Sequence, residues 1–133
     1  MEDKIFVIAV DDDDVILDMY KGGLVNYDVM VFDEPKKARE YLFAGNRKPD
    51  IILMDIMMPS VDGITLIREI HSSDKLCDIP IVAVSGLSDA ATLNDAMLFG
   101  AVDYIIKPFD IVELSNRIRS IVKKYKNRKM EER

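Results

Sequence analysis

The chain has 133 residues, of which 49% are hydrophobic and 32% charged, and its formal net charge is −6. A chain of this length builds one hydrophobic core, so the composition excludes a multidomain architecture as well as a disordered or fibrous chain. No apolar run approaches the ~20 residues that cross a bilayer, and residues 1–4 lack the basic-then-apolar order of a secretion signal. These features favour a soluble, cytoplasmic protein.

Short apolar runs that are rich in Ile and Val recur along the chain. Their apolarity is continuous rather than alternating, which is typical of parallel strands covered on both faces. Each run therefore predicts a buried strand. The runs are Ile5–Val10, Val29–Phe32, Ile51–Met54, Ile81–Val84 and Val102–Ile106.

A helix is predicted after each run from the spacing of apolar residues and from start and stop signals. The first helix follows Asp13 or Asp14, and the third follows Asp62-Gly63. The fourth begins at Ser88-Asp89 and stops at Gly100. The positions that we expect these three helices to bury are Ile16, Met19, Tyr20, Leu24, Leu66, Ile67, Ile70, Leu93, Ala96 and Met97.

The second and fifth helices have clearer boundaries. The second starts at Asp33 as N-cap, has Pro35 in its first turn and ends at Gly45. The fifth opens with Asp110 and Glu113 at the spacing of a capping box. Their expected apolar faces consist of Ala38, Tyr41 and Leu42 in the second helix and of Ile111, Leu114, Ile118, Ile121, Val122 and Tyr125 in the fifth.

Alternating strands and helices predict an α/β fold: a doubly wound, five-stranded parallel sheet in the order 2-1-3-4-5, with five helices on both faces, as in flavodoxin-like proteins. Ligands of such sheets bind beyond the carboxyl ends of the strands. Polar residues follow four of the runs, namely Asp11, Asp12, Asp55, Ser85 and Lys107. We expect their side chains to gather at one edge of the sheet.

Converging carboxylates repel one another, so they need a cation between them. Cys77 is the only cysteine and His71 the only histidine, which excludes a disulfide within the chain and a thiolate or imidazole cluster. A site of oxygen ligands favours Mg²⁺, which is usually held by one or two carboxylates together with phosphate oxygens. Lys107 and Ser85 would then bind a phosphoryl group, and Asp55 would be its nucleophilic acceptor.

Each of these residues also has a simpler interpretation when it is taken alone. Residues 11–14 can be a solvated acidic turn that caps a helix, and Asp55 an ordinary loop carboxylate. Ser85-Gly86 can be a turn, and Lys107 a surface lysine. Their joint occurrence at four strand ends favours the functional interpretation.

The carboxyl-terminal part of the chain is basic. Residues 117–133 carry eight Lys or Arg side chains against two Glu. We interpret them as a solvated helix face rather than a binding patch, and the acidity of the whole chain argues against nucleic-acid binding by this domain. We expect the domain to comprise residues 1–126 and the basic tail, or the start of a linker, residues 127–133.

Four motifs together strongly resemble the receiver domain of two-component response regulators, as in the chemotaxis regulator. They span residues 10–13, 54–63, 84–86 and 103–109, and the resemblance covers about residues 4–125. It implies that Asp55 is the phosphorylated aspartate and that Asp11 and Asp12 bind Mg²⁺ together with the backbone carbonyl of Met57.

The same resemblance implies that Ser85 is a switch hydroxyl, Tyr104 a switch aromatic residue and Lys107 the phosphoryl-binding lysine. It also implies a cis peptide bond before Pro108. A histidine kinase or a phosphotransfer protein would phosphorylate Asp55. The fourth helix, fifth strand and fifth helix would then change and contact a downstream protein, an output domain or a second copy of the chain. Such a domain is a switch and not a turnover enzyme, and neither a membrane nor nucleic acid is an expected partner.

Met57 and Leu87 follow Asp55 and Ser85 by two residues and cannot hold a water, so we expect slow loss of the phosphoryl group. The alternative is that both side chains pack at the rim of the site. Met at position 57 argues against a haloacid-dehalogenase-type phosphatase, and the acidic residues 11–14 argue against a flavin or dinucleotide site. The remaining alternative function is a receiver-fold interaction module that works without phosphorylation.

Overall fold

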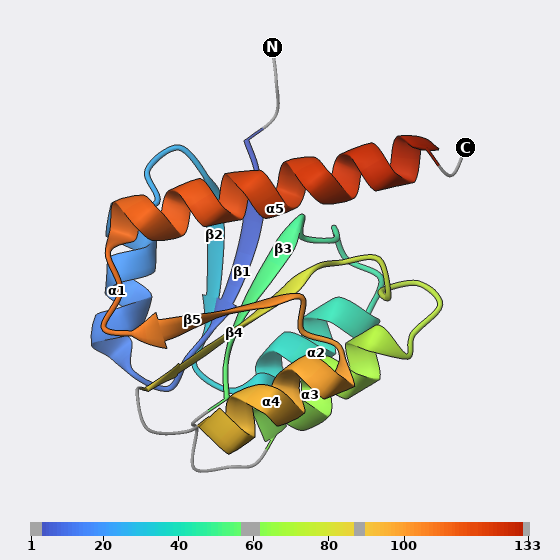
Figure 1. Ribbon diagram of the computed structural model, residues 1–133, viewed down its shortest axis with the longest axis horizontal. Coiled ribbons are helices and arrows are strands. Elements are labelled where there is room, and N and C mark those ends of the chain that lie inside the picture. Colours follow the sequence, from blue (N-terminus) through green and yellow to red (C-terminus); the bar gives the residue numbers. More distant parts are fainter. Residues whose placement is uncertain (1–3, 57–61, 87–89, 132–133) are drawn as a thin grey trace.

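Strands and helices alternate along the parts of the chain that the computed structural model describes, residues 4–56, 62–86 and 90–131 (Figure 1). The strands are β1 (Phe6–Val10), β2 (Asp28–Phe32), β3 (Ile51–Asp55), β4 (Ile81–Gly86) and β5 (Asp103–Lys107). The helices are α1 (Asp14–Gly23), α2 (Pro35–Phe43), α3 (Asp62–His71), α4 (Ala90–Phe99) and α5 (Ile111–Glu131). Each apolar run that predicted a strand lies in one, with ends shifted by one or two residues.

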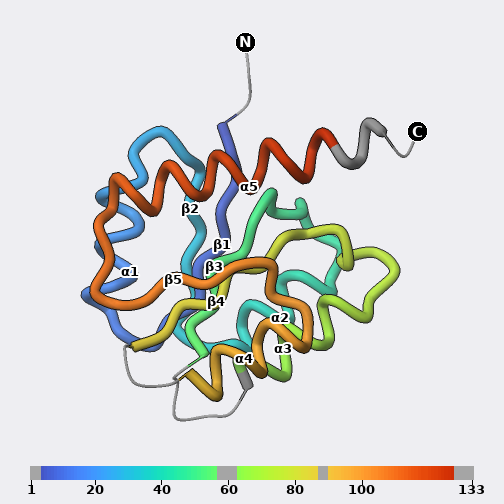
Figure 2. The backbone as a smooth tube through the Cα atoms, viewed as in Figure 1, coloured from blue at the N-terminus to red at the C-terminus, as the bar shows by residue number. Residues whose placement is uncertain are grey.

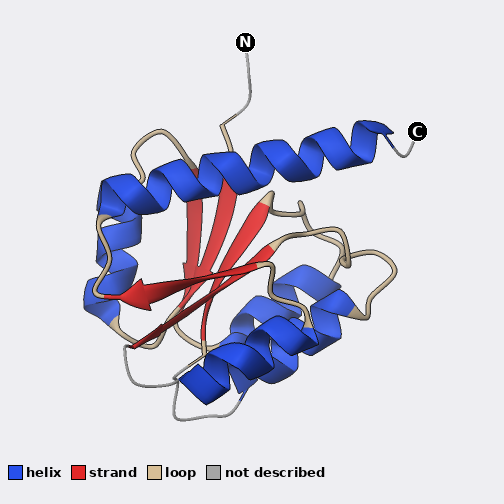
Figure 3. Cartoon of the chain, viewed as in Figure 1, coloured by secondary structure: helices blue, strands red, loops and turns tan. Residues whose placement is uncertain are grey.

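The strands form one parallel sheet in the order β2-β1-β3-β4-β5, which confirms the predicted topology. Helices lie on both faces of this sheet (Figure 3). An apolar cluster fills the space between the sheet and the helices on each of its faces. One joins the sheet to α2, α3 and α4, and the other joins it to α1 and α5. Every residue of β1 and of β3 is buried, as continuous apolarity predicts for central parallel strands.

Helix α1 begins where the sequence predicts. Its N-cap is Asp13, whose Oδ1 accepts a hydrogen bond of 2.9 Å from the backbone N–H of Val15. The predicted burial of Met19 is wrong, because this side chain is 38% exposed. Leu17, which the prediction left out, is buried in its place, together with Tyr20, which was predicted correctly.

Two other helical expectations are corrected. The predicted N-cap of α2, Asp33, lies one residue too early. Pro35 takes the first helical position, for which its fixed φ suits it, so Glu34 is the N-cap and makes no capping hydrogen bond. Asp33 accepts a hydrogen bond from Lys37 instead. In α4, Met97 is 39% exposed, because Leu93 and Ala96 form the buried face.

Helix α5 starts at a capped end and continues beyond the expected domain boundary. Oδ1 of Asp110 accepts hydrogen bonds from the backbone N–H groups of Val112 and Glu113. The helix is continuous across residues 126 and 127, and the division of the chain at that point remains a prediction. Arg117, which we assigned to a solvated basic helix face, donates to both carboxylate oxygens of Asp103. No helix among the described residues is long and apolar enough to span a bilayer.

Candidate functional site

The carboxyl ends of β1, β3 and β5 bring three charged residues to one edge of the sheet. Asp11 directly follows β1, Asp55 ends β3 and Lys107 ends β5. Val10 and Met54 are partners in the β1–β3 register, so Asp11 and Asp55 are the next residues along two adjacent strands. The sheet itself therefore sets the two carboxylates beside each other.

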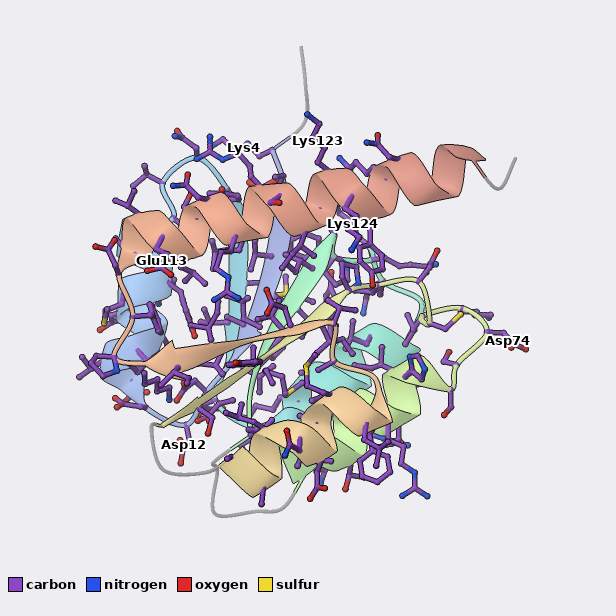
Figure 4. All side chains as sticks on the ribbon, in the orientation of Figure 1. Lys4, Asp12, Asp74, Glu113, Lys123 and Lys124 are labelled. Carbon is purple, nitrogen blue, oxygen red and sulfur yellow. The ribbon has the colours of Figure 1, made fainter. Side chains whose placement is uncertain are left out.

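Three carboxylates form an acidic cluster at this edge. One oxygen from each of Asp11, Asp12 and Asp55 lies within 4.8 Å of the others. Asp11 and Asp55 are buried, whereas Asp12 is exposed. Figure 4 shows Asp12 at the opposite end of the molecule from Lys4 and Lys123. The cluster is therefore open to solvent on the side of Asp12.

Lys107 reaches into the cluster. Its Nζ lies 2.7 Å from Oδ2 of Asp11 and 3.4 Å from Oδ2 of Asp55, where it donates a hydrogen bond. Burial alone lowers the pKa of the Lys107 ammonium, but contact with Asp11 and the negative charge of Asp55 outweigh that effect and raise the pKa above its ordinary value. Lys107 is thus a fixed positive charge at the site.

The two carboxylate oxygens of Asp11 have different partners. Oδ1 of Asp11 accepts a hydrogen bond of 2.9 Å from the backbone N–H of Asp13. Oδ2 is buried, and its partner among the described residues is the Lys107 ammonium, in an ion pair of 2.7 Å. This oxygen and the carboxylates of Asp12 and Asp55 beside it are the kind of ligand that Mg²⁺ prefers.

The remaining predicted site residues lie around this cluster or outside the described residues. Ser85 is completely buried near the end of β4, and its hydroxyl donates a long hydrogen bond of 3.4 Å to the carbonyl of Gly86. Tyr104 on β5 is 43% exposed. Met57 and Leu87 lie outside the residues that the structure describes. The peptide bond between Lys107 and Pro108 is cis, as the resemblance implies.

A contact near the site was not foreseen from the sequence. The Tyr20 ring in α1 stacks on the ring of Phe109, with centroids 5.7 Å apart and planes inclined by 6°. Burial, and then the charges of Asp11 and Asp55, raise the pKa of the Tyr20 hydroxyl well above its usual range. The sequence signals were a Tyr in the middle of a predicted helix and a Phe after Lys107-Pro108, but neither identifies the partner of the other.

Comparison with known proteins identifies the family and the fold. The family model for the response regulator receiver domain matches residues 7–119. The transcriptional regulatory protein KdpE of Staphylococcus aureus is 37% identical over 123 residues, which cover 91% of this chain and 50% of that protein. The DNA-binding dual master transcriptional regulator RpaA of Synechocystis sp. is 30% identical over 120 residues, which cover 89% and 49%.

The chain thus spans about half the length of these curated relatives. Among solved structures, a response regulator receiver domain protein (CheY-like) from Methanospirillum hungatei matches with a TM-score of 0.84. The match covers 95% of this chain and 99% of that one at 22% identity, so it is a likeness of fold.

Proposed function

Because the chain belongs to the response regulator receiver domains, we propose that it is a two-component signalling switch whose phosphoryl acceptor is Asp55. The observation that supports this assignment is the ion pairing of Lys107 with both Asp11 and Asp55 beside the acidic cluster. Asp55 is buried at the end of a central strand and faces a fixed cation. Its carboxylate can therefore accept a phosphoryl group, because the Lys107 ammonium neutralises the added negative charge.

The carboxylates of Asp11, Asp12 and Asp55, with the backbone carbonyl of Met57, would hold Mg²⁺. When bound, the ion would neutralise negative charge on the transferring phosphoryl group. The acidic cluster, whose oxygens lie within 4.8 Å of one another, supports this choice of ligands. Asp12, which is exposed, would be the ligand nearest to solvent.

The transfer itself needs positioning and charge more than an added base. One carboxylate oxygen of Asp55 attacks the phosphorus, and an O–P bond forms as the bond between phosphorus and the donor nitrogen breaks. The donor's imidazole keeps that electron pair, and Lys107 pairs with the charge that arrives on the phosphoryl oxygens. The chain accepts the group and later loses it to water, so we class it as a switch and not as a turnover enzyme.

Ser85 and Tyr104 would move in response to phosphorylation of Asp55 and so change the surface of the domain. Within the described residues, the Ser85 hydroxyl makes one long hydrogen bond, to the Gly86 carbonyl, so it can turn toward a phosphoryl oxygen at little cost. Tyr104 is 43% exposed and can move into the space that Ser85 leaves. The surface formed by α4, β5 and α5 would then change for a downstream partner.

The partners follow from the same assignment. A histidine kinase or a phosphotransfer protein would supply the phosphoryl group. The curated relatives are named as transcriptional regulators and are about twice as long as this chain, which supports an output domain as the downstream element. Direct binding of nucleic acid or a membrane by this domain is not part of the proposal. We place the protein in the cytoplasm and allow for a phosphorylation-dependent homodimer.

Intact mass tests the proposal against the alternative, an interaction module that works without phosphorylation. The native protein, Asp55→Asn and Asp18→Asn are each incubated with Mg²⁺ and a small phosphodonor. Asp18 is an exposed carboxylate of α1 whose charge partner is Lys21, so it is the matched control. We expect one phosphoryl adduct on the native protein and on Asp18→Asn, and none on Asp55→Asn. No adduct on the native protein, or an equal adduct on all three, would favour the alternative.

A further inference from the structure

The connection that follows Lys107 is short and rests on α1. Lys107 ends β5, and α5 begins at Ile111, so three residues lie between them. Figure 2 shows this connection passing beside α1, between the end of β5 and the start of α5. Tyr20 of α1 contacts this connection, and Gly23, three residues further along α1, lies against Ile111 at the start of α5.

The first contact is the ring stack of Tyr20 on Phe109, with centroids 5.7 Å apart. Tyr20 is 1% exposed, so its ring is enclosed on every side. Parallel aromatic rings at this separation contribute about 0.5–1.5 kcal/mol beyond the area that they bury. The stack therefore fixes the residue that lies two positions after Lys107.

The second contact depends on a glycine. A Cβ atom at Gly23 would lie 2.5 Å from Cγ1 of Ile111 and 3.0 Å from Cδ1, which is too close for either pair of carbons. The Ile111 side chain, at the start of α5, thus keeps its position against α1 because residue 23 lacks a side chain. A Cβ atom at Gly22, the adjacent residue, would meet nothing within 4 Å.

The position of this connection matters because of the lysine that precedes it. The Lys107 ammonium is carried on a flexible four-carbon stem, so the backbone at residue 107 decides where it can reach. Its Nζ is 3.4 Å from Oδ2 of Asp55, the distance at which an ammonium pairs with a carboxylate oxygen. A displacement of about 1 Å in such a group can change a rate by about 10²-fold.

We propose that Tyr20 and Gly23 are positioning residues for Lys107, which hold the connection after β5 against α1 and thereby keep the ammonium in reach of Asp55. This inference rests on the proposed function, because it assigns the contact a role in phosphorylation. Neither residue would touch the phosphoryl group. The aromatic ring of Tyr20, and not its hydroxyl, makes the contact that matters.

Aromatic substitutions test the stack. The rate of phosphoryl adduct formation is measured with Mg²⁺ and a small phosphodonor for Tyr20→Leu, Tyr20→Phe and Tyr27→Leu. Tyr27 is a buried ring of the same apolar cluster, whose hydroxyl bonds to Ser115, so its replacement controls for a lost core ring. We expect Tyr20→Leu to react about tenfold more slowly, and Tyr20→Phe and Tyr27→Leu to stay within about twofold of the native rate.

Glycine substitutions test the second contact. Gly23→Ala must displace Ile111, whereas Gly22→Ala adds the same methyl group to open space. Alanine is the better helix former at both positions, so helix propensity alone predicts that both variants become more stable. We expect Gly23→Ala to react several-fold more slowly, and Gly22→Ala to react at the native rate. Equal rates in the two variants would overturn the role of Gly23.

A double variant separates positioning of Lys107 from general disruption. In a Lys107→Ala background, Tyr20→Leu should cause no further loss of rate, because the group that it positions is gone. An undiminished further loss would overturn the inference, as would equal slowing by Tyr20→Leu and Tyr27→Leu.

Hydrogen exchange of residues 107–112 gives a readout that needs no phosphorylation. Tyr20→Leu should speed exchange there, and Tyr27→Leu should not. If the native chain took no phosphoryl group while exchange responded as expected, the proposed function would fail. The conclusion that contact with α1 keeps the connection after β5 in place would still stand. Unchanged exchange in Tyr20→Leu would contradict the role of Tyr20 in fixing this connection, whatever the phosphorylation result.

Discussion

The Lys107 ammonium lies nearer to Asp11 than to Asp55, at 2.7 Å from Oδ2 of the first and 3.4 Å from Oδ2 of the second. The Asp11 oxygen is also buried. Lys107 and a metal ion would therefore compete for the same oxygen. Such competition would make Lys107, the proposed phosphoryl-binding residue, a regulator of cation affinity as well.

Lys107→Met should tighten the binding of Mg²⁺. Removing a positive charge from beside two buried carboxylates lowers the electrostatic cost of adding a divalent cation, and we expect the dissociation constant to fall by about 3–10-fold. Calorimetric titration measures it. Lys37→Met is the control, because Lys37 is exposed and pairs with Asp33 outside the cluster. Weaker binding by Lys107→Met would contradict the competition.

Mg²⁺ should stabilise the protein through the acidic cluster. At ten times the dissociation constant, a ligand that binds only the folded state adds about 1.4 kcal/mol, which corresponds to a rise of about 3–8 °C in melting temperature. Asp12→Ala should lose most of this rise, because it removes one of the clustered carboxylates. Asp18→Ala should retain it. An equal rise in both variants, measured by thermal unfolding, would place the ion elsewhere.

Tyr20 should make the fold sensitive to high pH. Burial raises the pKa of its hydroxyl in the folded state, and the charges of Asp11 and Asp55 act in the same direction. A tyrosine in the unfolded chain ionises near pH ~10, so above that pH the unfolded state binds fewer protons than the folded state. The free energy of unfolding then falls by about 1.4 kcal/mol per pH unit from this residue.

The contribution of Tyr20 is therefore fully present below pH ~10 and is lost as the pH rises toward the folded-state pKa. Tyr20→Phe should show a shallower decline between pH 9 and 11, measured by urea unfolding at a series of pH values. Parallel declines for the native protein and this variant would show that the hydroxyl ionises freely in the folded state.

Met57→Asn and Leu87→Glu should shorten the lifetime of the phosphoryl group on Asp55. Polar side chains at these two positions can orient an attacking water, whereas Met and Leu cannot. We expect decay to speed up by about tenfold when both are changed, in line with the effect of positioning a reactant. The measurement is the decay of the mass adduct after the phosphodonor is removed, and lifetimes equal to the native one would support simple packing of both side chains.

The sheet was predictable because its signal is local. Continuous apolar runs such as Ile51–Met54 mark buried parallel strands, and the residues that follow them identify the edge where Asp11, Asp55 and Lys107 meet. Helix faces were less predictable. Met19 and Leu17 are both apolar and lie two residues apart on α1, on different sides of the helix, and packing against the sheet decides which of them is buried.

The finer geometry of the site could not be read from the sequence. Nothing in the motifs tells whether Lys107 pairs more closely with Asp11 or with Asp55, because that depends on tenths of an ångström in side-chain position. The stack of Tyr20 on Phe109 joins residues far apart in the chain, and spacing along one helix carries no information about such a partner. Likewise, nothing in the sequence shows that Gly23 lies against the Ile111 side chain at the start of α5.

The pairing of Val10 with Met54 ties the chemistry of this domain to its folding. A slip of one residue between these strands would turn one carboxylate toward the opposite face of the sheet. The acidic cluster therefore cannot form unless β1 and β3 are paired in this register. Under denaturant, the capacity to bind a divalent cation and the native backbone pairing should vanish in a single cooperative transition.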